Sequence, residues 1–234
     1  PNNHLKWSSV YTGNGTVFCG CANAFYATDS LNLVDNSGNQ CITKVDLNGF
    51  DQSVAFICHT RNQWTWTITQ ANADSRYAWV TSAVPATVTM TGIESLEVAL
   101  QFSGAASLKL TGVAKGNDGI YTIKNRYSDT TGTLSVTKGT VAFDAGAGWG
   151  GDISVADSGV VSFLKNCPQN SSATVYGNAV ITGTGKINVA AGVRYNCLTL
   201  TVGGVSVPQG TYSISQLKAT YGDSYFSGSG RIRV

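Results

Sequence analysis

The sequence predicts an all-β fold, a single parallel β-helix (solenoid) with coils of about 20 residues. The first observation is an internal repeat, in which residues 132–143 (GTLSVTKGTVAF) align with residues 151–163 (GDISVADSGVVSF). The second is that turn-forming glycines recur throughout the chain and leave only short segments of alternating polarity between them. The third is that no window carries the i, i+3, i+4, i+7 apolar spacing of an amphipathic helix.

The internal repeat fixes the expected stacking. Each half consists of two short alternating strands joined at a Lys-Gly or Ser-Gly corner. A unit this small cannot bury its apolar face alone, so it must stack on similar units. We therefore expect Leu134 to lie over Ile153 and Phe143 over Phe163, with all four side chains buried. The glycine-rich segment 146–151 between the halves is predicted to be a wide turn.

Composition favours one ordered domain covering residues 1–234. Charged residues make up 12% of the 234 residues and apolar residues 42%, which fits strands and turns with uncharged surfaces and does not fit disorder. Within the domain, residues 1–44 are expected to form less regular coils and residues 45–234 repeat-like coils. The net charge of +2 and the absence of Lys or Arg runs exclude a nucleic-acid partner.

Alternating segments account for most of the chain between the turns. Residues 45–57 form two strands around an Asn48-Gly49 corner, and residues 65–68, 76–80, 86–90, 96–102 and 107–110 continue the alternation. The nearest candidates for a helical turn are residues 62–70 and 215–220. No apolar run is long enough for a transmembrane helix. No signal peptide is evident, and we expect a mature or trimmed product.

Six cysteines indicate an oxidising compartment. The cysteines fit no zinc spacing, and an even number in a β-rich chain of low charge favours disulfides over buried thiols and over a metal site. Two bridges are expected within the N-terminal group, since neighbouring coils bring Cα atoms within bonding range. A third bridge is expected between the last two cysteines. The candidates are Cys19, Cys21, Cys41, Cys58, Cys167 and Cys197.

Several segments resemble the autotransporter-associated β-strand repeat of large bacterial surface proteins. They include VDLNGFDQSV, TSAVPATVTMTG, TGTLSVTKGTVAF and WGGDISVADSGVVSF, and the closing LTLTVGGVSVPQGTYSI and YFSGSGRIRV. The resemblance covers roughly residues 45–234, and the cysteines depart from it. It implies a right-handed parallel β-helix that is secreted or displayed on a bacterial surface. It implies no catalytic residues, metal or cofactor.

An aromatic group supplies the best small-site candidate. Flat rings beside hydrogen-bonding side chains are the ordinary composition of a sugar-binding surface, although an aromatic stack inside the coil is the alternative interpretation. The glycan-binding candidates are Trp64, Trp66, Tyr77, Trp79, Arg61 and Arg76. The acidic residues are scattered among turns, which does not favour a glycosidase pair.

The expected function is structural or adhesive: a non-enzymatic, extracellular segment of a surface stalk, layer or fibre. The alternative is a glycan-active protein, either a carbohydrate-binding β-helix or a polysaccharide lyase or hydrolase. The last alternating segment of the given sequence is followed by no capping segment, so we also expect head-to-tail self-association through the terminal coils. The candidate residues for this contact are Trp7, Tyr11, Ile232 and Val234.

Overall fold

The computed structural model describes residues 9–11, 15–36, 42–62, 77–92, 96–112, 119–124, 127–144, 146–166 and 177–234. These residues form an all-β protein with one α-helix, α2 (Ile214–Tyr221), and one short 3-10 helix, η2 (Asp223–Tyr225). The strands are β1 (Ser9–Tyr11), β2 (Thr16–Phe18), β3 (Leu31–Asn36), β4 (Ile42–Asp46), β5 (Gln52–Val54), β6 (Ile57–Asn62), β7 (Tyr77–Met90), β8 (Leu96–Val98), β9 (Leu100–Leu110), β10 (Ile120–Lys124), β11 (Tyr127–Ser128), β12 (Leu134–Asp144), β13 (Gly148–Trp149), β14 (Ile153–Phe163), β15 (Ala179–Ile181), β16 (Lys186–Val189), β17 (Arg194–Asn196), β18 (Leu200–Val202), β19 (Val205–Val207), β20 (Thr211–Ser213), β21 (Phe226–Gly228) and β22 (Arg231–Arg233).

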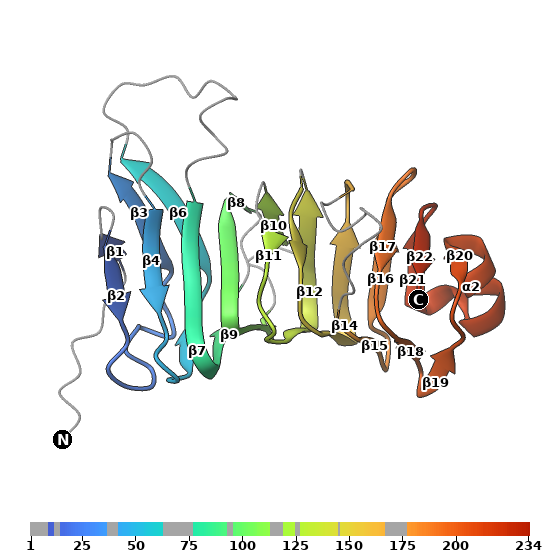
Figure 1. Ribbon diagram of the computed structural model, residues 1–234, viewed down its shortest axis with the longest axis horizontal. Helices are drawn as coiled ribbons and strands as arrows, with labels where there is room; N and C mark the ends of the chain where they lie inside the picture. Colours follow the sequence, from blue (N-terminus) through green and yellow to red (C-terminus); the bar gives the residue numbers. More distant parts are fainter. Residues whose placement is uncertain are drawn as a thin grey trace.

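A 14-stranded sheet organises the fold. Its main path runs β19-β18-β15-β14-β12-β9-β7-β4-β2, and shorter strands branch from it. Every pairing in it is parallel except that of β18 with β19. The strands stand side by side along the long axis, from β2 near one end to α2 at the other (Figure 1). The prediction of an all-β, mainly parallel arrangement is confirmed.

Long strands belong to two columns of pairing. Residues 134–136 of β12 pair with β9, whereas residues 140–144 pair with β10. We call column A the successive segments 52–54, 88–90, 108–110, 134–136, 153–155, 179–181 and 200–202. We call column B the successive segments 96–98, 121–123, 141–143, 161–163, 187–189 and 226–228.

The stacking predicted from the internal repeat is confirmed. Leu134 pairs with Ile153 and Phe143 with Phe163, and none of the four side chains is more than 2% exposed. The offset grows from 19 to 20 residues because the register shifts after Val136. The bulged segment of β14 contains Asp157, whose φ of 50° lies in the left-handed region. The corner at Gly139 pairs with the corner at Gly159.

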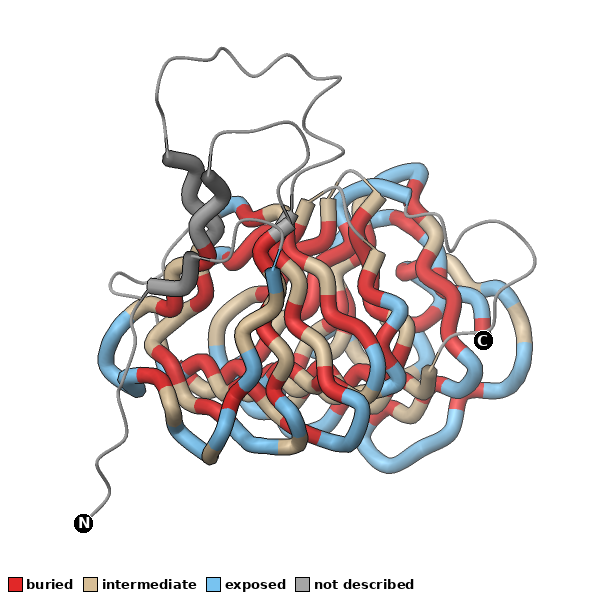
Figure 2. Tube along the Cα trace, turned by 60° about the vertical axis from the view of Figure 1, so that its left-hand side comes forward, coloured by how far each residue is buried: buried red, intermediate tan, exposed pale blue. Residues whose placement is uncertain are grey.

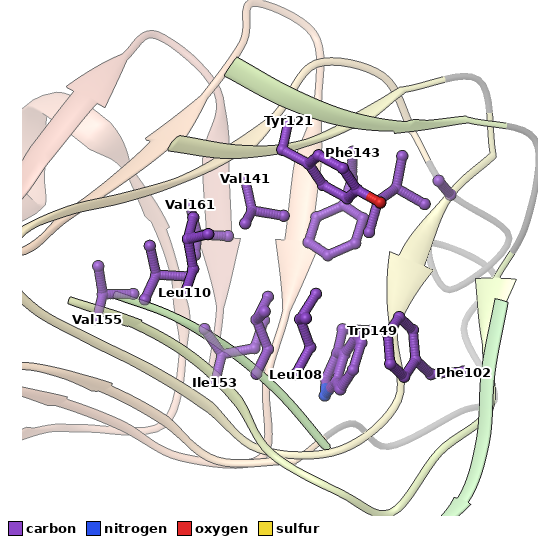
Figure 3. Close-up of a cluster of buried hydrophobic side chains, with 14 of the residues drawn as sticks. Phe102, Leu108, Leu110, Tyr121, Val141, Phe143, Trp149, Ile153, Val155 and Val161 are labelled. Carbon is purple, nitrogen blue, oxygen red and sulfur yellow. The ribbon is translucent and has the colours of Figure 1, made fainter. Parts of the chain in front are cut away.

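Strand alternation builds one apolar interior. Residues 153–155 and 134–136 show the pattern buried, intermediate, buried, so every second side chain points inward. Buried residues lie along the strands, and exposed residues lie mainly at the turns (Figure 2). Phe102 and Leu108 of β9, Tyr121 of β10, Phe143 of β12 and Trp149 of β13 converge on a common cluster (Figure 3).

The sequence predicted a wide turn for the glycine-rich segment 146–151. This prediction is wrong, because part of the segment is a strand. Gly148 and Trp149 form β13, which pairs with β11. Trp149 is 1% exposed, its ring lies 5.1 Å from that of Phe102, and its Nε1 donates to the carbonyl oxygen of Gly132 at 2.9 Å. The small glycines let the backbone approach its neighbours while the indole fills the interior.

The C-terminal end is closed by the chain itself. Strand β22 lies between β17 and the antiparallel β20, and Ile232 is fully buried. Helix α2 begins with a capping box in which Ser213 and Gln216 exchange hydrogen bonds, and it buries Ile214 and Leu217. The expectation that the last strand stops without a cap is therefore wrong. Both β20 and α2 precede this strand in sequence; β20 covers one edge of β22, and α2 packs against β20 and β21.

Candidate functional site

The outer side of column A carries a regular row of short polar side chains. The pairings place seven outward residues opposite one another in succession, and none of them is buried. We call this set the outer row: Ser53, Thr89, Lys109, Ser135, Ser154, Val180 and Thr201. Neighbouring members are separated by one strand spacing, about 4.8 Å. Five of the seven carry hydroxyl groups, so this surface offers a line of small donors and acceptors.

Side chains beside the outer row connect successive strands. Asp152 Oδ1 accepts from the backbone N–H of Asn178 at 2.7 Å and from its Nδ2 at 3.1 Å. Asn178 Oδ1 in turn accepts from the hydroxyl of Thr199 at 2.8 Å. A continuous series of side-chain hydrogen bonds thus links three consecutive strands of column A. Cross-strand pairs of this kind stabilise neighbouring strands.

Column B has an equivalent polar ladder. Asn188 Nδ2 donates to Ser162 Oγ at 2.7 Å, and Ser227 Oγ donates to Asn188 Oδ1 at 3.0 Å. These residues pair directly along β14, β16 and β21. Ser162 is 5% exposed although its neighbours Val161 and Phe163 occupy the interior. The amide of Asn188 therefore binds two adjacent strands at once.

Charges alternate in sign along the edge of column B. The ammonium group of Lys124 lies 2.6 Å from the carboxylate of Glu97 and 3.9 Å from that of Asp144. Lys165 lies 3.5 Å from the other oxygen of Asp144. The exposed members contribute little individually, about 0–1 kcal/mol for each pair. Their order places opposite charges side by side on successive strands.

Trp79 is the predicted glycan-binding residue whose side chain the structure describes. It lies on the outer side, since its neighbours Ala78 and Val80 are buried. Its Nε1 donates to Ser103 Oγ at 2.6 Å, and the ammonium of Lys44 lies 4.7 Å from its ring centroid. Ser103 Oγ also donates to Thr81 Oγ1 at 3.0 Å. The ring is thus a half-buried outer aromatic surrounded by polar groups, and it is not part of an internal stack.

The other members of the aromatic group are not placed beside it. Trp64, Trp66 and Arg76 lie outside the described residues, and for Arg61 in β6 and Tyr77 in β7 only the backbone is described. The same holds for the self-association candidates, because Trp7 lies outside the described residues and Tyr11 is described only as backbone. The other two candidates, Ile232 and Val234, are buried.

The acidic residues around the Asn48-Gly49 corner hold backbone groups, Asp46 within the turn and Asp51 across to β7. Asp46 Oδ1 accepts from the backbone N–H of Asn48 at 2.9 Å, and both corner residues have positive φ. Asp51 Oδ1 accepts from the backbone N–H of Thr87 at 2.7 Å. Both carboxylates are committed to backbone groups, as the sequence indicated. Among the described residues, no group of three or more His, Cys, Asp or Glu could hold a metal ion.

The described cysteines form no disulfide with one another. Cys19 and Cys197 are buried thiols. Burial raises the pKa of Cys197 to about 12, and burial with added repulsion from Asp46 and Cys21 raises the pKa of Cys19 to about 12. A buried thiol at Cys197 does not fit the predicted bridge to Cys167, which lies outside the described residues, as does Cys41. The remaining pairings stay predictions.

Two arginines that the sequence analysis missed meet at a cleft near the C-terminal end. Arg194 in β17 and Arg231 in β22 are direct partners in the parallel pairing. They line a cleft of about 670 Å³ together with Asn166, Gly192, Val193, Thr211, Ser229 and Gly230. The sequence does not show that they are neighbours, since Arg231 follows Arg194 by 37 positions and α2 lies between them. This insertion breaks the repeat of about 20 residues that would have aligned them.

Comparison with protein-family models, curated proteins and solved structures gave no match. Within the part of the chain that the structure describes, no helix is long and apolar enough to cross a membrane.

Proposed function

We propose that this chain is a right-handed parallel β-helix that serves as a rigid, non-enzymatic structural segment of a protein outside the bacterial cell. In this proposal each step of the parallel sheet is one coil. The resemblance to the autotransporter-associated repeat supports the handedness and the location. The role is that of a stalk, layer or fibre segment that carries load or displays neighbouring parts.

The observation that carries the proposal is the coupling of successive strands on both sides of the sheet. Inside, Phe143 stacks on Phe163 at 5.5 Å, and Phe163 stacks on Tyr195 at 4.2 Å. Outside, Asn188 binds Ser162 and Ser227 on its two neighbouring strands. Each strand is thereby held by apolar contacts, backbone hydrogen bonds and polar side chains together. Such redundancy favours a stiff, extended element.

Single-molecule pulling tests this function. We expect the chain, held at its two ends, to resist force until it yields in successive steps. Asn188→Ala removes one polar ladder and should lower the force of the corresponding step, whereas Val205→Ala at an exposed position should not. A single event at low force, unchanged in Asn188→Ala, would contradict a load-bearing role. Turnover of uronic-acid polymers by the purified chain would contradict the non-enzymatic part.

The second candidate function, glycan binding, is favoured by the position of Trp79. An outer indole beside the hydroxyl of Thr81 presents an apolar surface and a hydrogen-bonding group to a sugar ring. A glycan array with the purified chain should then give signals that Trp79→Ala removes. Tyr26→Ala, at another exposed aromatic residue, is the matched control. Signals equal in the parent chain and both variants would reject this surface.

A further inference from the structure

We propose that the Asn48-Gly49 corner is a modification site, at which the Asn48 side chain is converted to aspartate and isoaspartate through a cyclic imide. This inference goes beyond the structural role and does not depend on it. The sequence contains two Asn-Gly pairs, and Asn14 of the other pair lies outside the described residues. Asparagine is among the thermolabile residues of proteins. A following glycine leaves its own backbone nitrogen unshielded, because it has no Cβ.

The reaction needs only water as a co-reactant. The backbone nitrogen of Gly49 gives up its proton and attacks Cγ of Asn48, so that a new C–N bond forms. The Cγ–Nδ2 bond breaks, and the amide nitrogen leaves with the proton as ammonia. Water then opens the imide ring, at Cγ to give aspartate or at the backbone carbonyl carbon to give isoaspartate. The net change replaces a neutral amide by a carboxylate.

The corner presents the Asn48 side chain to solvent. The carbonyl oxygen of Leu47 accepts from the N–H of Phe50 at 2.9 Å, and the two residues between them have φ of 51° and 79°. These values describe the tight turn that an Asn-Gly pair favours. Asn48 is exposed, and its Nδ2 donates to the carbonyl oxygen of Cys19 at the long distance of 3.3 Å. The leaving group and the attacking water are therefore accessible.

One hydrogen bond holds the attacking nitrogen. The N–H of Gly49 donates to Oγ of Ser82 at 3.1 Å, and Ser82 is fully buried. The nitrogen must lose this proton before it attacks, so the bond keeps the closed corner unreactive. A hydrogen bond of this kind shifts the equilibrium between a closed and an open corner by about two- to tenfold. Ser82 is thus a positioning residue that slows the reaction.

Asn23 provides a comparison within the same chain. It is also exposed, and its φ of 53° is also left-handed. The N–H of the next residue is held by a side chain there too, since Ala24 donates to Oε1 of Gln52 at 2.8 Å. The difference is the Ala24 methyl group, which crowds the nitrogen that Gly49 leaves open. Of these two asparagines, we expect Asn48 to react.

The modification should loosen the first coil. A carboxylate at position 48 cannot donate to the carbonyl oxygen of Cys19, and it adds a negative charge beside Asp46, whose Oδ1 accepts from the N–H of this position. Isoaspartate also lengthens the backbone by one carbon atom. The N–H of Cys19 donates to the carbonyl oxygen of Asp46 at 2.8 Å, so both contacts of Cys19 with the next coil lie at this corner.

The test is peptide mapping by mass spectrometry after incubation of the intact folded chain at mildly alkaline pH, with the denatured chain as reference. We expect conversion at Asn48, faster conversion in the denatured chain and none at Asn23 in the folded samples. Ser82→Ala should speed conversion at Asn48 by about two- to tenfold and leave Asn23 unchanged. Ser82→Thr, which keeps a hydroxyl group, should restore the slower rate.

Asn48→Asp tests the consequence separately from the rate. It should lower the thermal midpoint by about 2–4 °C and speed hydrogen exchange at the N–H of Cys19. An unchanged midpoint and unchanged exchange would contradict the loosening of the first coil.

Other results would overturn the site itself. No conversion at Asn48 in the folded chain would mean that the fold blocks the reaction. Equal conversion at Asn48 and Asn23 would mean that the corner has no reactivity of its own. An unchanged rate in Ser82→Ala would remove the role of the hydrogen bond, and faster conversion at both asparagines would replace it by a general loosening of the fold.

Discussion

Phe143 and Phe163 are partners in adjacent parallel strands, and their rings stack with centroids 5.5 Å apart and an interplanar angle of 20°. Both side chains are buried. The 20 residues between them thus bring the chain back to the same place in the sheet, one strand further along. This relationship connects the internal sequence repeat to the packing of the interior.

Removing one ring from this stack should destabilise the protein strongly. Phe143→Ala deletes a fully buried side chain and leaves a cavity that the neighbouring strands cannot close. We expect a loss of about 3–5 kcal/mol in the free energy of unfolding, measured by denaturant titration. Val205→Ala, at a 58% exposed position, should change that free energy by less than about 0.5 kcal/mol. Equal losses of unfolding free energy in the two variants would contradict the burial of Phe143.

The close approach of neighbouring corners should make Gly159 intolerant of a side chain. A Cβ at Gly159 would overlap the carbonyl oxygen of Val136 in the preceding strand, whereas a Cβ at Gly20 would meet nothing within 4 Å. We expect Gly159→Ala to lower the free energy of unfolding by about 1–3 kcal/mol. Gly20→Ala is the matched control and should be nearly neutral. A tolerated Gly159→Ala would mean that the two corners are not stacked as described.

The Ile232→Asp variant distinguishes the result expected from the sequence from the result expected from the structure. The sequence predicted a weakened end-to-end contact, but a carboxylate at this fully buried position would have no partner in the apolar interior. We now expect loss of the cooperative fold, seen as a large drop in the thermal midpoint. Sedimentation velocity measures the association state of the same variant. A stable Ile232→Asp variant that differs only in its association state would restore the original interpretation.

Alkaline pH should destabilise the protein through its buried thiols, of which Cys197 is the one to be varied. The ordinary pKa of 9.0 for Cys197 is raised to about 12 by burial. The unfolded chain therefore loses this proton above about pH 9 while the folded chain keeps it. Stability falls as pH rises through this window and is unaffected by this group below it. Buried Tyr121, with its pKa raised well above 10.0 by desolvation and by Cys58, acts in the same direction.

The measurement is the unfolding free energy between pH 8 and pH 11 for the parent chain and for Cys197→Ala. The variant lacks one titrating group, so its stability should decline less steeply with pH. It should start from a lower value, because the substitution also removes packed volume. Identical slopes would show that Cys197 titrates alike in both states, in conflict with its burial.

The sequence was informative where the repeat is regular and silent where it is interrupted. Leu134, Val136, Val141 and Phe143 could be paired with their partners because few residues separate the copies and the alternation is clean. The C-terminal cap could not be predicted, since β19, β20 and α2 are inserted between Arg194 and Arg231. Strand periodicity does not say which later strand an inserted hairpin will cover. The cleft between these arginines was missed for the same reason.

The candidate aromatic site shows another physical limit. The sequence alternation placed Trp64 with Trp66 and Tyr77 with Trp79, but it left open which side of the strand faces the interior. The burial of Ala78 and Val80 decides this for Trp79. Two small inward residues leave the large ring outside, against the usual preference of aromatic residues for the core.

Spin-label distances along the outer row test the stacked arrangement most directly. Labels carried by non-natural residues leave the native thiols intact, and pulsed electron resonance then measures the label separation. One label stays at Thr201, and the second moves to Lys109, to Thr89 and to Ser53, which lie four, five and six pairings away. The account predicts backbone separations of about 19, 24 and 29 Å, rising by one strand spacing at each step. Separations that do not rise in this order, or that rise by unequal steps, would contradict a continuous parallel stack.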